Sequence, residues 1–126
     1  MNKIYVLILL VASICSCNTN TKSTLPSYNV IEDKVYDIPI KSQVSLRVYL
    51  TDSTATKQQV TALIESLSDT QITRSMKYHS VPTHVFIYVY KSQSDYDNNS
   101  GSWVAMYEKA GTDEPGDYHY NNESLD

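Results

Sequence analysis

Two stretches of the chain alternate between apolar and other residues in the manner of β-strands. In QVSLRVYL (residues 43–50) every second residue is valine or leucine, which predicts a strand with one buried face. In THVFIYVYK (residues 83–91) both sets of alternating positions are apolar or aromatic. A strand that is apolar on both sides is typical of the middle of a sheet.

The segment between these two strands has the spacing of an amphipathic helix. Its apolar residues recur at i, i+3, i+4 and i+7 and form one stripe, made of Val60, Leu63, Ile64 and Leu67. Thr56 and Gln59 precede the stripe at the spacing of a capping box, which predicts the start of the helix. Because Gln71 and Arg74 stand where the stripe would continue, the helix either ends near Ser68 or continues, partly exposed, to Arg74.

The rest of the chain indicates loops and further strands. Pro82 favours a loop before the second strand, residues 92–101 predict a turn, and residues 102–109 predict another strand. An early strand over residues 34–40 is indicated more weakly, and residues 117–126 form a weak terminal strand or a frayed end. This order predicts an α+β fold, a two-layer sandwich with one main helix packed on a small, mostly antiparallel sheet.

The N-terminus has the features of an export signal. Lys3 precedes an apolar run that is shorter than the roughly 20 residues of a membrane-spanning helix, which predicts a signal peptide over residues 1–16. Ile14 and Ser16 lead to Cys17 in a pattern that resembles the lipobox of bacterial lipoproteins, whose cysteine is acylated and starts the mature chain. Ile14 stands where leucine is usual, and Cys15 where serine or alanine is. Ordinary cleavage and an uncleaved anchor are therefore the alternatives.

Lipid attachment at Cys17 implies an extracytoplasmic protein anchored to a bacterial membrane, at the outer membrane or the cell surface, because each buried methylene of an acyl chain contributes about 0.8 kcal/mol. A polar, Ser/Thr/Asn-rich tether over residues 17–33 then leads to the α+β domain over residues 34–112. The domain starts near Tyr28 or near Lys34. An acidic C-terminal tail follows over residues 113–126.

The charge distribution excludes one class of partner. The formal net charge is −4, and acidic and basic residues balance between Cys17 and Thr112, so that the net negative charge lies in the tail. No basic stripe is present, and nucleic acid is therefore excluded as a partner. The tail is either a solvated end or a binding segment.

Three motifs in a fixed order resemble a family of small uncharacterised bacterial domains, a domain of unknown function. They are IKSQVSLRVYL with the helix after it, KYHSVPTHVFIYVY and SGSWVAMYEKAG. The resemblance covers residues 36–111. It implies a domain assignment and no activity.

Candidate chemistry is sparse. His79 and His84 flank Pro82, and His119 offers a third nitrogen ligand, but no Cys, Asp or Glu is interleaved at ligand spacing. DYDNNSG, residues 95–101, lacks the glycine and the glutamate that a calcium loop needs at its sixth and twelfth positions. No nucleophile motif and no glycine-rich phosphate loop is present. We therefore expect no catalytic residue, no metal and no cofactor.

Eleven tyrosines against one phenylalanine call for an explanation. A tyrosine ring packs while its hydroxyl keeps water or a partner, so tyrosine suits a sheet face that is only partly covered. Alternatively, these side chains form an exposed aromatic platform for an envelope protein or a glycan, built from Tyr49, Tyr88, Tyr90 and Trp103.

Two functions follow as hypotheses. The first is a membrane-tethered binding or accessory lipoprotein, with ligand or partner contacts at Tyr78, His79, His84, Tyr88, Tyr90 and Trp103. The second is a small hydrolase-like or metal-dependent enzyme that uses the corner formed by Tyr78, His79 and His84. The first is favoured because the enzyme lacks a recognisable motif.

Lipid attachment can be tested on the intact protein. In the membrane fraction, its mass should equal that of the chain from Cys17 plus acyl groups, and Cys17→Ser should abolish the added mass because serine offers no thiol for acylation. Intact-mass spectrometry measures both. A soluble wild-type protein without lipid would contradict the prediction.

Overall fold

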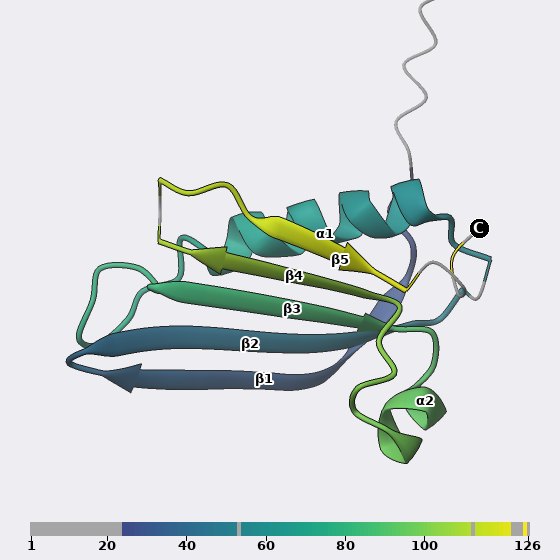
Figure 1. The fold of residues 1–126 in the computed structure, drawn as a ribbon, viewed down its shortest axis with the longest axis horizontal. Coiled ribbons are helices and arrows are strands. Elements are labelled where there is room, and N and C mark those ends of the chain that lie inside the picture. The colour runs from purple at the N-terminus through teal and green to yellow at the C-terminus, as the bar shows by residue number, and fades with distance from the viewer. Residues whose placement is uncertain (1–23, 53, 112, 122–124, 126) are drawn as a thin grey trace, which may run out of the picture.

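A computed structural model describes residues 24–52, 54–111, 113–121 and 125. The signal peptide over residues 1–16, Cys17 and the first part of the tether lie outside these residues. Figure 1 shows one sheet with one main helix along one face. The elements are β1 (Tyr28–Ile38), β2 (Lys41–Leu50), α1 (Lys57–Gln71), β3 (His84–Tyr90), α2 (Gln93–Asn98), β4 (Ala105–Ala110) and β5 (Asp117–Tyr120).

The five strands lie in the order β1-β2-β3-β4-β5. β1 and β2 form an antiparallel hairpin, and β3, β4 and β5 form an antiparallel meander. α1 connects β2 to β3, and these two strands are parallel because the chain must cross back over the sheet before it pairs again. The α+β prediction is confirmed, with β3 in the middle of the sheet as its double-sided apolar pattern predicts.

The capping box predicted at the start of α1 is present. The Thr56 hydroxyl accepts a hydrogen bond from the Gln59 amide, and the Gln59 side chain accepts one from the Thr56 amide. The helix ends at Gln71, between the two ends that the sequence allows. Among the described residues, no helix is long and apolar enough to cross a membrane.

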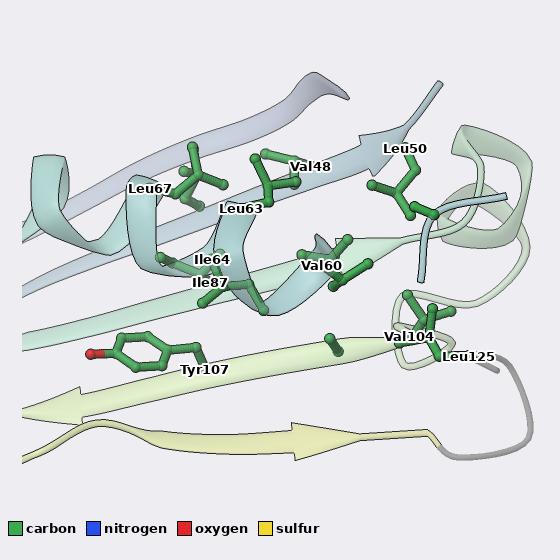
Figure 2. Packing of buried hydrophobic residues seen from close by; sticks show 14 of the residues in the cluster. Val48, Leu50, Val60, Leu63, Ile64, Leu67, Ile87, Val104, Tyr107 and Leu125 are labelled. Atoms are coloured by element: carbon green, nitrogen blue, oxygen red, sulfur yellow. The ribbon is translucent and has the colours of Figure 1, made fainter. Parts of the chain in front are cut away.

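The core lies between α1 and the sheet, as Figure 2 shows. The predicted stripe of α1 is buried against alternate residues of the neighbouring strands, whose members are Leu46, Val48, Val85, Ile87 and Val89. Ala105, Tyr107 and Leu125 extend the core beyond β3. Leu125 is only 7% exposed, so part of the predicted acidic tail packs on the domain.

Several predicted boundaries are wrong. β1 begins at Tyr28, the earlier of the two predicted starts of the domain. Residues 28–33 therefore belong to the sheet and not to the tether, because they pair with β2 through a bulge near Val30. The predicted turn over residues 92–101 contains α2, whose first turn is capped when the Ser92 hydroxyl accepts a hydrogen bond from the Asp95 amide. β4 starts only at Ala105. β5 is the terminal strand that the sequence indicated weakly within residues 117–126, and it pairs with β4.

A matched pair of isoleucines tests this assignment of the core. Ile64 is fully buried and Ile40, in the β1–β2 turn, is 87% exposed. Ile64→Ala should lower the free energy of unfolding by about 2–5 kcal/mol through lost contacts and a cavity, whereas Ile40→Ala should change it by less than about 0.5 kcal/mol. Urea unfolding followed by the fluorescence of the single tryptophan measures both. Equal losses in the two variants would contradict the packing.

Candidate functional site

The face of the sheet opposite α1 is built from polar and aromatic side chains. Strand register and alternation place one row of each strand there, with Glu32, Lys34 and Tyr36 from β1, Gln43, Ser45, Arg47 and Tyr49 from β2, Phe86 and Tyr88 from β3, Met106 and Glu108 from β4, and His119 from β5. We call this the open face. No described helix of more than two turns covers it.

Arg47 organises the centre of the open face. Its guanidinium lies 4.0 Å from the centre of the Tyr88 ring, a cation–π distance. Its Nε lies 3.3 Å from a carboxylate oxygen of Glu32, and its Nη1 donates hydrogen bonds to the Tyr90 hydroxyl and the Ser100 carbonyl. The charged group is therefore held in one orientation by groups on three sides.

The prediction that Tyr90 contacts a ligand or partner is wrong, because the side chain is buried. It is fully buried, packs edge-on against Tyr96, and donates a hydrogen bond of 2.6 Å to the Ser100 carbonyl. Burial raises the pKa of its hydroxyl, which therefore stays protonated at neutral pH. Tyr90 holds the Arg47 guanidinium through a hydrogen bond and has no exposed surface for a partner.

The remaining aromatic residues do not form one platform. Tyr88 and Tyr49 are half-buried on the open face, and the Tyr49 hydroxyl accepts a hydrogen bond from the Asn29 side chain. Trp103 is half-buried in the segment between α2 and β4, and within the described residues it stacks on no other ring. Tyr78 is 47% exposed in the loop before β3.

A second set of tyrosines lies on the helix side of the sheet. Tyr107, Tyr118 and Tyr120 pack in a row with ring centres 5.0 and 6.2 Å apart. The Tyr120 and Thr61 hydroxyls are hydrogen-bonded at 2.6 Å, which connects β5 to α1. Tyrosine therefore has two uses in this protein, at the wet edge of the core and on the open face, and the partly covered sheet accounts for much of its abundance.

Two hollows of opposite charge lie on the open face. One has a volume of about 330 Å³ and gathers Glu108, Glu114 and Asp117, against the single cation Lys109, around His84 and Phe86. The other has a volume of about 510 Å³ and lies over β1 and β2. We call the second the β1–β2 hollow. It contains Lys34 and Arg47 against one carboxylate, that of Glu32.

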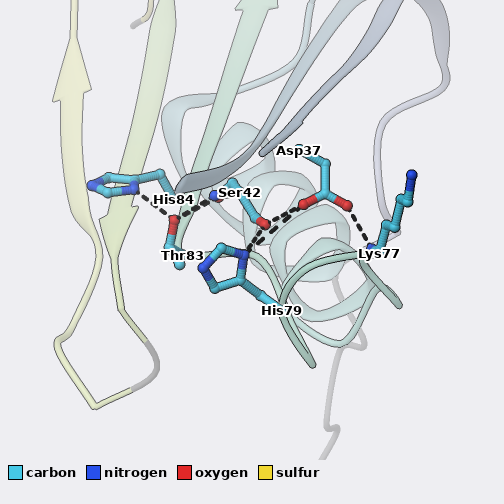
Figure 3. Close-up of polar contacts among 6 residues, drawn as sticks. All are labelled: Asp37, Ser42, Lys77, His79, Thr83 and His84. Carbon is cyan, nitrogen blue, oxygen red and sulfur yellow. Dashed lines mark hydrogen bonds and ion pairs between the residues drawn. The ribbon is translucent and has the colours of Figure 1, made fainter. Parts of the chain in front are cut away.

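The predicted histidine corner contains a polar network, drawn in Figure 3. The Ser42 hydroxyl lies 2.6 Å from an Asp37 carboxylate oxygen and 2.5 Å from His79 Nδ1. The other Asp37 oxygen accepts a hydrogen bond from the Lys77 amide. The network thus fastens the loop before β3 to the β1–β2 hairpin.

Ser42, His79 and Asp37 are the residue types of a catalytic triad in a different arrangement. A serine hydroxyl carries one proton, and when Ser42 donates it to Asp37, His79 Nδ1 must donate its own proton to Ser42. In a triad the histidine accepts the serine proton and the aspartate holds the other ring nitrogen. Ser42 is also fully buried, out of reach of a substrate. The arrangement serves to hold the corner together.

The two corner histidines do not converge. His84 Nδ1 lies 3.0 Å from the Thr83 hydroxyl, which donates a hydrogen bond to the Ser42 carbonyl, whereas His79 binds the Ser42 side chain. His119 lies on β5 on the open face, where its Nε2 is 3.4 Å from a carboxylate oxygen of Glu108. Over the described residues, no three His, Cys, Asp or Glu side chains are placed to hold a metal ion.

Sequence reasoning missed Asp37, Ser42 and Glu32 as partners of the residues it singled out. The alternation of β2 already places Arg47 opposite the core. Its pairing with Glu32, however, depends on the β1–β2 register after the bulge, which the sequence pattern does not report.

No protein-family model, curated protein or solved structure matches this chain. The resemblance to small bacterial domains of unknown function stays a prediction.

The Asp37 network predicts how stability depends on pH. The hydrogen bond from Ser42, and those from the amides of Lys77 and Tyr78, lower the pKa of the Asp37 carboxyl. Because an unfolded aspartate has a pKa of about 3.9, the ionised carboxylate stabilises the fold above about pH 4, and this contribution is lost as the pH falls through the folded pKa. Asp37→Asn should therefore reduce the loss of stability between about pH 5 and pH 2.

Urea midpoints measured across that pH range check this prediction. Asp97→Asn is the matched control, because Asp97 is exposed on α2 and its side chain makes no hydrogen bond to another described residue. An unchanged acid slope in Asp37→Asn would contradict the assigned role.

Proposed function

We propose that the protein is a membrane-tethered extracytoplasmic lipoprotein that acts as a binding or accessory module, with the open face as its contact surface. Support for the anchor comes from the lipobox-like sequence before Cys17. A tether and a lipid orient the domain at a membrane surface and leave the sheet accessible to envelope components.

The observation that carries the proposal is the immobilised Arg47–Tyr88 pair between two hollows. Binding costs less when the contact residues are ordered beforehand, because few rotamers are lost on association. Arg47 is fixed by Glu32, Tyr88 and Tyr90 before any partner arrives. Tyrosine and arginine are also the side chains that dominate contact energies at interfaces.

The histidine corner favours this function over the enzyme. Its groups are used in fastening β1, β2 and the loop before β3, and the buried Ser42 offers no nucleophile to solvent. Partners are envelope proteins or glycans, and the net charge of −4 disfavours nucleic acid.

The open face can be tested on the full chain purified in detergent, mixed with cell envelopes that have been stripped of lipid. The wild type should sediment with the envelopes, and the double variant Phe86→Ala/Tyr88→Ala should bind at least about tenfold more weakly, since aromatic anchors often contribute more than 1.4 kcal/mol. Tyr28→Ala is the control, because Tyr28 is 39% exposed and pairs with Leu50 on the helix side of the sheet. Equal binding by all three proteins would refute the open face as the contact surface.

A further inference from the structure

The β1–β2 hollow contains two facing rows of side chains in register. Glu32, Lys34 and Tyr36 point from β1, and the paired residues Arg47, Ser45 and Gln43 point from β2. Successive members of one row are about 7 Å apart, and paired members are about 5 Å apart. The array is therefore about as wide as one sugar ring and two to three rings long.

The charge of this array is positive by one. Glu32 contacts both cations, at 2.6 Å from Lys34 Nζ and 3.3 Å from Arg47 Nε. One carboxylate neutralises one of two cations, and the Lys34 side chain remains 72% exposed. An anionic group of a ligand would neutralise the remaining positive charge of Lys34 and Arg47.

The rest of the array is uncharged and rich in hydrogen-bonding groups. The side chains of Ser45 and Gln43 make no hydrogen bond to another described residue, and both line the hollow. Tyr36, which is 55% exposed, stands beside Gln43 and offers a ring face. An amide, a hydroxyl and an exposed aromatic ring complement a sugar, whose hydroxyls need donors and acceptors and whose C–H face packs on a ring.

We propose that the β1–β2 hollow binds an acidic saccharide, a sugar chain that carries carboxylates. Lys34 and the outward side of the Arg47 guanidinium contact one carboxylate, Ser45 and Gln43 bind hydroxyls, and Tyr36 stacks on the next ring. This inference rests on the proposed function, because it names the ligand of one half of the open face.

The opposite charge of the other hollow, around His84 and Phe86, sets the orientation of the sugar chain. Glu108, Glu114 and Asp117 repel a carboxylated ligand from the β3–β5 side of the open face. The ligand therefore lies along β1 and β2 instead of across the sheet. A protein partner is less suited to this array. The centre of a protein–protein interface would remove water from Glu32, Lys34 and Arg47, and the array has no apolar pocket whose burial would offset that cost.

An NMR titration of the full chain in detergent micelles tests the proposal. The probes are an oligogalacturonate and its methyl ester, which has the same rings without the charges. Amide shifts on adding the oligogalacturonate should be confined to residues 32–36 and 43–47, and binding should weaken as salt is added. The methyl ester should bind at least about tenfold more weakly, the loss expected for one charge-assisted hydrogen bond.

Three variants at two lysines provide the matched comparison. Lys34→Gln should weaken oligogalacturonate binding at least about tenfold, Lys34→Arg should restore it, and Lys57→Gln, on α1 at the other face, should leave it unchanged. The exposure of Lys34 allows each variant to fold, and the spectrum of the free protein reports this directly.

The possible results separate this proposal from the proposed function. Equal binding of the ester and the acid, shifts outside the two rows, or an unchanged affinity in Lys34→Gln would each overturn the acidic-saccharide site. Absence of oligogalacturonate binding together with intact, Tyr88-dependent sedimentation with envelopes would overturn this site alone. Loss of envelope sedimentation in the wild type would instead remove the proposed function.

Discussion

One long helix, α1, for five strands is the constraint on which the rest of the structure depends. The crossover through α1 makes β2 and β3 parallel and places the helix on one side only. One face of the sheet thus becomes the core, and the other must be stable in water without a covering layer. The inner strands β2 and β3 meet this requirement by alternation, with valine, leucine and isoleucine on the helix side and mainly tyrosine, arginine and polar residues on the other.

Arg47 shows how the uncovered side is stabilised. Its position on β2 pairs it with Glu32 on one neighbouring strand and Tyr88 on the other, so that a single side chain connects three strands across the open face. The buried Tyr90 hydroxyl accepts a hydrogen bond from the Arg47 guanidinium. An arginine in this position packs through its planar guanidinium while remaining charged, which a lysine ammonium does not reproduce. In the proposed function, the same rigidity lowers the entropy cost of binding a ligand on this face.

The parts of the fold that were predicted correctly depend on local periodicity. The alternation of β2 and β3, the stripe from Val60 to Leu67 and the Thr56 capping box need only a few neighbouring residues to be recognised. β1 and β5 were predicted only weakly and with different bounds, because they are exposed edge strands that gain their order from pairing and have weak patterns of their own. The site was predicted least well. Glu32 reaches Arg47, and Asp37 reaches His79, only through strand register and loop packing between distant segments.

The corner network and the open face are coupled through β1 and β2. Asp37 and Ser42 close the hairpin at one end and are fastened to the loop before β3 by His79 and Lys77. Tyr36 and Gln43, the first pair of the β1–β2 hollow, directly adjoin Asp37 and Ser42 in the chain. Asp37, Ser42 and His79, which are the residue types of a catalytic triad, therefore serve to hold the edge strand in the register that aligns the two rows. An exposed edge strand paired on one side only needs such a fastening more than an inner strand does.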